Sequence, residues 1–154
     1  MHSETPEPGA VAALEWAEGA HRNARDLAAM VGVAPEQFDA DPLALIPRLE
    51  NYVTRLPLDE FEQSDWITLH SDLTSFLGDV LVRHYNARWI KAPDSDAPAG
   101  FRYLVEAEGL DGLTHRVEPY DVVMEEFHHL PIEVTRMLAN AEAVLCLSPD
   151  PEGA

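Results

Sequence analysis

The chain has 154 residues, of which 28 are acidic and 10 are basic, giving a formal net charge of −18. Such a negative surface disfavours nucleic acid and anionic membranes as partners, because both bind to cationic faces. The single cysteine, Cys146, excludes an intrachain disulfide framework, and a chain of this length buries enough surface to fold without one.

The ends of the chain set the expected compartment and domain limits. Residues 1–10 contain no basic segment followed by an apolar run, so no secretory signal is predicted. No stretch approaches the length of about 18 apolar residues that spans a membrane. We therefore expect a cytoplasmic protein with one domain over residues 9–147, a disordered N-terminus over 1–8 and a flexible C-terminal tail over 148–154.

Three helices are predicted in the first half of the chain. Apolar residues recur every three or four positions over residues 11–31, which is typical of an amphipathic helix. Asp41 followed by Pro42 is a helix start signal, and the apolar stripe that follows stops at Pro57. The third helix has the clearest apolar stripe, over residues 66–81, and is expected to start at Ser64 or Asp65 and to end at Asn86.

The second half changes from helical spacing to alternation. Residues 88–92, 101–106 and 113–117 are separated by turn residues and predict three short strands. Pro119 and Pro131 each fit the first turn of a following helix. The order predicts an α+β fold with N-terminal helices, a small three-stranded antiparallel meander and two C-terminal helices. We expect the third N-terminal helix to cover one face of the sheet, because an uncovered sheet face stays open to water.

Three segments of the second half form a recognisable set. They are Leu77-Gly78-Asp79-Val80-Leu81, Ala87-Arg88-Trp89-Ile90 and Val117-Glu118-Pro119-Tyr120-Asp121-Val122-Val123. With them, residues 69–147 resemble small bacterial α+β domains of unknown function, which implies a fold but no chemistry. Gly78 interrupts a helix and is expected to let another backbone pack close, and Trp89 is expected to anchor the first strand.

Acidic residues are dense in two stretches, 59–79 and 106–133. A negative face can steer and select a basic partner, so we predict a non-enzymatic acidic protein-binding module, similar in use to an immunity protein or a chaperone or adaptor. The alternative reading of the charge is solubility alone. The candidate contacts are the acids placed at predicted loops or helix surfaces: Asp59, Glu60, Glu62, Asp111, Glu125 and Glu126.

Two other functions stay open. Glutamate and histidine three residues apart on a helix are typical of carboxylate-bridged metal sites, and this spacing occurs twice. The candidate ligands are Glu18, His21, Glu125, Glu126, His128 and His129. The third possibility is a structural component that assembles as a homodimer. No cofactor is predicted, no catalytic motif is found, and enzymatic activity is left open with a non-enzyme favoured. Cys146 lies in an apolar run and is expected to be a buried structural thiol.

Overall fold

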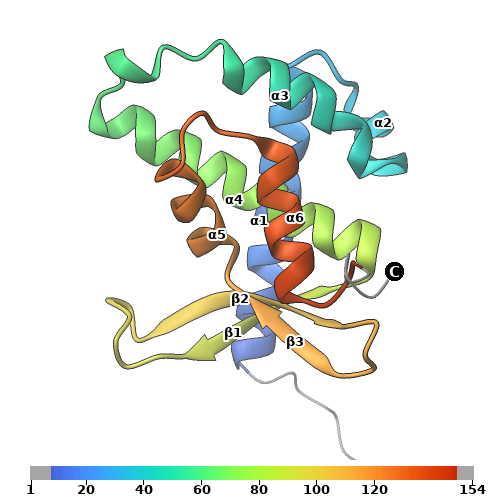
Figure 1. Cartoon of the computed structure of the whole chain (residues 1–154). Coiled ribbons are helices and arrows are strands. Elements are labelled where there is room, and N and C mark those ends of the chain that lie inside the picture. Colours follow the sequence, from blue (N-terminus) through green and yellow to red (C-terminus); the bar gives the residue numbers. More distant parts are fainter. Residues whose placement is uncertain (1–7, 149–154) are drawn as a thin grey trace, which may run out of the picture.

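The computed structural model of the protein describes residues 8–148, so the predictions for residues 1–7 and 149–154 lie outside the described residues. The predicted α+β fold with an antiparallel meander is confirmed (Figure 1). The elements are α1 (Pro8–Met30), α2 (Pro35–Ala40), α3 (Ile46–Thr54), α4 (Gln63–Tyr85), β1 (Arg88–Pro93), β2 (Phe101–Glu108), β3 (Thr114–Val117), α5 (Pro119–Phe127) and α6 (Val134–Val144).

Local signals set where the helices begin and end. The Asp41 carboxylate accepts a hydrogen bond from the Leu43 amide at 3.2 Å and starts a short 3-10 turn that continues into α3, as the sequence predicted. Asn86 ends α4 in the left-handed conformation, with φ of 57°, which asparagine tolerates better than most residues. The short helix α2 was not predicted, because it buries only Phe38 and shows no apolar period.

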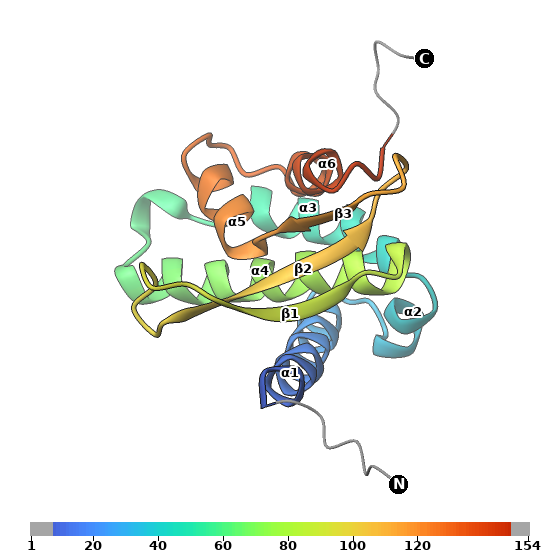
Figure 2. The same cartoon turned by 90° about the horizontal axis from the view of Figure 1, so that it is seen from below.

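The sheet has the strand order β1-β2-β3, and the helices lie mainly on one of its faces. The inner side chains Trp89, Val105 and Val117 stand opposite one another across the strands. Seen from below, the sheet lies in front of α4, which contacts both β1 and β2 (Figure 2). The expectation that this helix covers one sheet face is therefore confirmed, and no helix of residues 8–148 lies over the other face (Figure 2).

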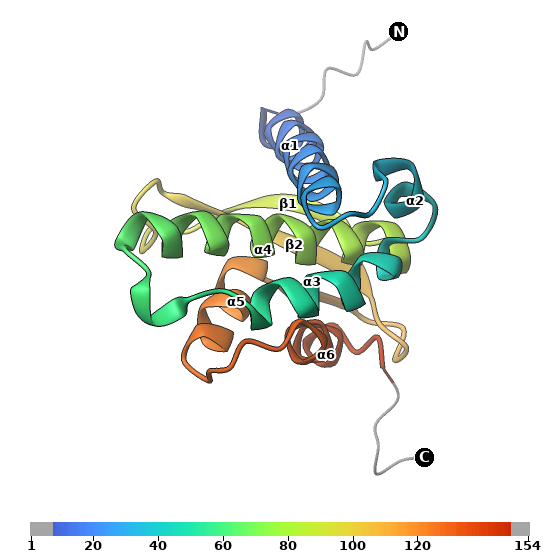
Figure 3. The same cartoon turned by 90° about the horizontal axis from the view of Figure 1, so that it is seen from above.

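The remaining helices lie on the two sides of α4. Figure 3 shows α1 on one side, and α3 and α6 on the other. Helix α1 packs against both α4 and β1, which the sequence did not predict. One apolar core connects these elements, with Leu27, Phe76 and Met137 among its fully or almost fully buried members. Among residues 8–148, no helix combines the length and apolar character that crossing a membrane requires.

Candidate ligand-binding pocket

A cavity of about 600 Å³ lies between α4, the first half of the sheet and the N-terminal part of α1. The loop before β2 and the start of α5 complete its walls through Pro98 and Tyr120. Small-molecule sites typically have volumes of about 300–1,000 Å³. The cavity is therefore large enough for a ligand of metabolite size.

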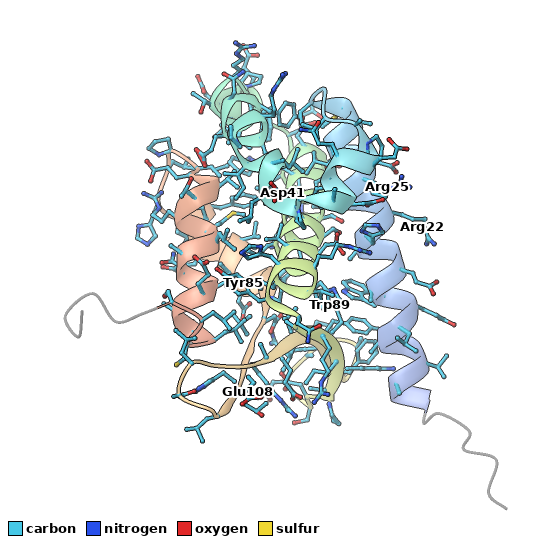
Figure 4. The ribbon with its side chains drawn as sticks, turned by 90° about the vertical axis from the view of Figure 1, so that its right-hand side faces the viewer. Arg22, Arg25, Asp41, Tyr85, Trp89 and Glu108 are labelled. Atoms are coloured by element: carbon cyan, nitrogen blue, oxygen red, sulfur yellow. The ribbon has the colours of Figure 1, made fainter. Side chains whose placement is uncertain are left out.

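Aromatic rings form the wall of the cavity that faces α4. Trp16 stacks on Tyr103 with 4.2 Å between ring centroids and meets Trp89 edge-on at 5.9 Å. Phe101 meets Tyr103 edge-on at 5.4 Å. Figure 4 shows Trp89 between α4 and α1, where both helices restrict the indole ring. The wall presents flat apolar surface whose orientation is fixed by ring–ring contacts.

Gly78 explains how Trp89 reaches this position. An ideal Cβ atom built on Gly78 would lie 1.9 Å from Cζ2 and 2.8 Å from Cε2 of Trp89. Only a hydrogen atom fits there, so the indole ring lies directly on the backbone of α4. The expectation of a close approach at Gly78 is confirmed, although a side chain rather than a second backbone makes it.

The opposite wall is a polar face of α4. Ile67, His70, Ser71, Thr74 and Ser75 recur at three- and four-residue spacing and therefore share one side of the helix. Small hydroxyl side chains at three of these positions leave the space that the cavity occupies. The same residues give a largely apolar cavity its hydrogen-bonding groups.

Two buried polar atoms in the cavity wall have no protein partner. Within residues 8–148, three buried side-chain atoms make no hydrogen bond, and two of them belong to residues that line this cavity: Thr74 Oγ1 and Trp89 Nε1. Their residues are only 7% and 6% exposed. An unsatisfied buried donor costs about 1–3 kcal/mol, so such atoms need an explanation. They lie close together in the fold, since Trp89 Cε2, which carries Nε1, packs on Gly78 one helical turn after Thr74.

His70 is held at the edge of the cavity by α5. Its Nε2 atom lies 2.9 Å from the carbonyl oxygen of Tyr120, so Nε2 carries the proton and donates. The imidazole also stacks on the Tyr120 ring with 3.9 Å between centroids. The two contacts fix the start of α5 against α4 and define one side of the cavity.

An ion-pair network lies at another part of the cavity wall. Arg102 Nη1 lies 2.9 Å from Glu118 Oε2, and its Nε atom also bonds Asp94. Glu118 and then Asp94 raise the pKa of Arg102 above its ordinary value. Loss of water raises the pKa of Glu118, and this effect outweighs the opposing bond from Arg102. The two raised pKa values are compatible, because burial makes Glu118 harder to ionise, while two carboxylates stabilise the charged form of Arg102. The charge of Arg102 is therefore matched within the protein.

The residues predicted to bind a partner fall in different places. Asp59, Glu60 and Glu62 are exposed around the 3-10 turn before α4 and form no ion pair with any residue in 8–148. Glu125 is exposed at the end of α5, where its Oε1 atom lies 2.9 Å from Nε2 of His129. Aromatic contacts join this end of α5 to the start of α4. The ring centroid of Trp66 lies 5.1 Å from the ring centroids of both Phe61 and Phe127.

The other two predicted contacts do not belong to this surface. Glu126 is 2% exposed, so the expectation that it lies on a helix surface is wrong. Its Oε2 atom accepts bonds from Arg136 Nε at 3.0 Å and from the Glu133 amide at 2.9 Å, which explains how a charge is buried there. Asp111 lies in the turn between β2 and β3, away from the start of α4 (Figure 1).

The predicted metal ligands also do not converge. His21 on α1 is engaged by two carboxylates, with Nδ1 2.8 Å from Asp79 Oδ2 and Nε2 3.1 Å from Asp39 Oδ1. Glu18 is exposed on the same helix. The other four predicted ligands lie at the C-terminal end of α5 or directly after it: Glu125, Glu126, His128 and His129. None of these residues belongs to a group of three metal-binding donors in the described chain.

Sequence reasoning missed the cavity, although one signal was present. Ser71, Thr74 and Ser75 stand beside the apolar stripe of α4, and a row of small hydroxyls next to a core face leaves room for a ligand. Comparison of the chain with models of protein families, with curated proteins and with solved structures finds no match. The function must therefore be argued from the geometry of this cavity and of the surface.

Proposed function

We propose that this protein binds a small, planar, uncharged molecule that carries a hydrogen-bond acceptor, in the cavity between α4 and the sheet. The observation that carries the proposal is the pair of buried, unpartnered atoms, Thr74 Oγ1 and Trp89 Nε1, in one aromatic cavity. The wall of the cavity offers flat aromatic surface and hydrogen-bonding groups. A binding role fits this set of groups.

The unpartnered atoms define what the ligand must offer. An indole N–H only donates, so Trp89 requires an acceptor such as a ring carbonyl or ring nitrogen. The Thr74 hydroxyl can donate to the same acceptor or accept from a neighbouring N–H. A ligand that satisfies both atoms recovers part of the cost of burying them, about 1–3 kcal/mol for each.

The walls define the shape and charge of the ligand. Trp16, Trp89 and Tyr103 offer ring faces and edges, against which a flat molecule packs well. Arg102 is already bonded to Glu118 and Asp94, so it offers little to an anionic ligand. A neutral bicyclic heterocycle with a carbonyl next to the ring nitrogen or oxygen meets these conditions.

The indole N–H signals in a ¹⁵N-resolved NMR spectrum test this proposal directly. Coumarin and 2-quinolone serve as probes with an acceptor, and naphthalene as a probe of similar shape without one. The acceptor probes should shift the Trp89 signal saturably, while Trp66, which is not part of the cavity wall, reports non-specific effects. Naphthalene should bind more weakly and leave the Trp89 N–H without a hydrogen-bond shift.

A matched pair of valine variants isolates the contribution of the hydroxyl. Thr74→Val removes the buried hydroxyl at nearly constant volume, and Thr68→Val makes the same change at an exposed site on α4. Thr74→Val should weaken binding of the acceptor probes about three- to tenfold, the effect of losing one hydrogen bond, and Thr68→Val should not. The proposal fails if no acceptor probe binds saturably, or if the Trp66 signal moves as much as that of Trp89.

A second candidate function is recognition of a basic protein at the acidic surface formed by Asp59, Glu60, Glu62 and Glu125. Its support is that the first three carboxylates are exposed and without an ion pair in residues 8–148, next to half-buried Phe61 and Trp66. Such a face favours a cationic partner over nucleic acid. Cytoplasmic location stays a prediction, and a homodimeric structural component stays a separate possibility.

Affinity capture with a charge-reduced variant tests the second function. The triple variant Asp59→Asn, Glu60→Gln and Glu62→Gln should lose a captured protein that the unaltered chain retains at low salt. The triple variant Glu15→Gln, Glu18→Gln and Asp26→Asn removes the same charge from three exposed acids of α1, which form no ion pair in residues 8–148, and serves as the control. If the triple variant and this control retain the same proteins equally, the acidic surface is not the binding face.

A further inference from the structure

Three side chains with metal-binding atoms meet at the end of the sheet opposite the loop before β2. Asp111 comes from the turn between β2 and β3, His115 from β3 and Cys146 from the segment after α6. One donor atom of each lies within 4.8 Å of the others, and within residues 8–148 no other group of three such residues is this close. Their convergence depends on the tertiary fold, because α5 and α6 separate Cys146 from the other two.

The backbone fixes the three residues relative to one another. The Leu110 amide donates to the Cys146 carbonyl oxygen at 2.7 Å, which ties the turn to the segment after α6. An ideal Cβ on Gly109 would lie 2.8 Å from both Cys146 Cβ and the Leu145 carbonyl oxygen. The two segments therefore pack as closely as a glycine allows.

Cys146 has an unusual backbone conformation for its residue type. Its φ of 55° lies in the left-handed region, which costs a residue with a side chain roughly 1–2 kcal/mol. The conformation closes the end of α6, because the Leu147 amide donates to the Glu142 carbonyl oxygen at 2.8 Å. Here the conformation places a half-buried thiol beside Asp111 and His115, contrary to the expectation of a buried structural thiol.

Asp111 and His115 already hold each other in position. Oδ2 of Asp111 lies 2.7 Å from Nε2 of His115, and Oδ1 accepts from the Leu113 amide at 3.0 Å. The carboxylate is therefore oriented by the turn backbone before any ligand arrives. One carboxylate oxygen and one imidazole nitrogen thus stand side by side next to the sulfur.

We infer that Asp111, His115 and Cys146 form a binding site for Zn²⁺ or a similar thiophilic divalent cation. Zinc binds sulfur at about 2.3 Å, imidazole nitrogen at about 2.0–2.1 Å and carboxylate oxygen at about 2.0–2.2 Å, with tetrahedral geometry. These lengths place the donor atoms about 3.4 Å apart in a tetrahedron, so side-chain movements of the order of 1 Å bring the present atoms into position. The bond between Asp111 and His115 opens as the metal enters between them.

The proposed site has three protein ligands, which leave the fourth coordination position of the metal facing solvent. Asp111 is exposed, so water can occupy the fourth position, as in zinc sites that remain open to a further ligand. Leu110, Leu113 and Val144, which lie close in sequence to the three donors, are also exposed. The site shares no residue with the cavity, so it stands or fails independently of the proposed function.

Cobalt titration of the untagged full chain tests the site, because Co²⁺ replaces Zn²⁺ and reports a bound thiolate by a sulfur-to-cobalt charge-transfer band. One equivalent should produce the band, and Zn²⁺ should displace it. Cys146→Ser should abolish the band, and His115→Gln should weaken binding at least about tenfold, given that even indirect supports of metal sites cost that much. His84→Gln, which changes an exposed histidine on α4, is the matched control and should leave binding unchanged.

Alkylation of the single cysteine by iodoacetamide gives a second readout. One equivalent of Zn²⁺ should slow alkylation of Cys146 in the unaltered chain and in His84→Gln, but less in His115→Gln. Circular dichroism of the metal-free variants confirms that each is folded. Absence of the cobalt band, its persistence in Cys146→Ser, or alkylation at the same rate with and without Zn²⁺ would overturn the inference, and the last result would assign a free thiol.

Discussion

Replacing Gly78 by alanine tests the packing that creates the cavity. Alanine is favoured over glycine in a helix by about 1 kcal/mol, so propensity alone predicts stabilisation. The added methyl group, however, would lie 1.9 Å from Trp89 Cζ2, whereas ordinary contacts of a Cβ atom lie at 3.4–4 Å. The indole ring must therefore retreat by about 1.5 Å, the difference between 1.9 and 3.4 Å.

That retreat costs more than the helix gains. Overpacking a core costs about 1–3 kcal/mol, and the large displacement places Gly78→Ala at the upper end of this range. We expect a net loss of about 2 kcal/mol, which lowers Tm by about 4–8 °C in a domain of this size. The ring can move only toward the cavity or Trp16, so the variant should also bind the acceptor probes more weakly.

Gly19→Ala is the matched control on α1. Its new methyl group would meet only Arg22 Nη2, at 3.8 Å, so the helix gain of about 1 kcal/mol should appear as a rise in Tm of about 2–4 °C. Urea denaturation followed by circular dichroism measures both variants. If Gly78→Ala is as stable as Gly19→Ala, the contact between Trp89 and the α4 backbone does not constrain the fold as described.

Two further predictions concern buried carboxylates. Glu126→Gln should lower the free energy of unfolding by about 2 kcal/mol, because a buried charge-assisted hydrogen bond is lost. The neighbouring variant Glu125→Gln should change the free energy of unfolding by less than about 0.5 kcal/mol, because this side chain is exposed. Equal effects of the two variants in urea denaturation would contradict the assignment. Arg88, and then Arg116, hold the pKa of Glu106 below its ordinary value, so the folded carboxylate stays ionised where the unfolded one binds a proton. Its stabilising contribution is complete above about pH 4.3 and is lost as the pH falls further, so Glu106→Gln should show a smaller loss of stability on acidification, and parallel pH curves would refute the assignment.

The fold could be predicted where local physics decides it. The apolar stripe of α4 and Pro119 in the first turn of α5 act within a few residues of themselves, and each predicted an element that the structure contains. The placement of Pro131 in the first turn of the last helix is wrong, because α6 begins only at Val134. The alternation in β2 likewise predicted a strand. Short turns on both sides of β2 predicted an antiparallel meander, because strands joined by short turns pair in opposite directions. Helix α2 escaped prediction because a single buried side chain, Phe38, produces no period.

The sites could not be predicted, because their residues meet only in three dimensions. The sequence predicts Glu126 on the surface, because it does not show that Arg136, ten residues later, donates a hydrogen bond to it. Thr74 and Trp89 belong to different elements, and nothing in the sequence shows that both lack a partner. Cys146 reads as a core thiol, since the turn that carries Asp111 approaches it only after α6 has packed.

The position of α1 beside β1 has a consequence for how copies of the chain can meet. An exposed sheet edge invites a strand from another molecule, and such edge-to-edge pairing is a common route to aggregation. Helix α1 contacts β1 and lies next to it in Figure 2, so it hinders strand addition on that side. The other edge, β3, has only four residues, and Arg116 is exposed on it. The meander thus stays at three strands, and any dimer is expected to form through surfaces other than the sheet edges.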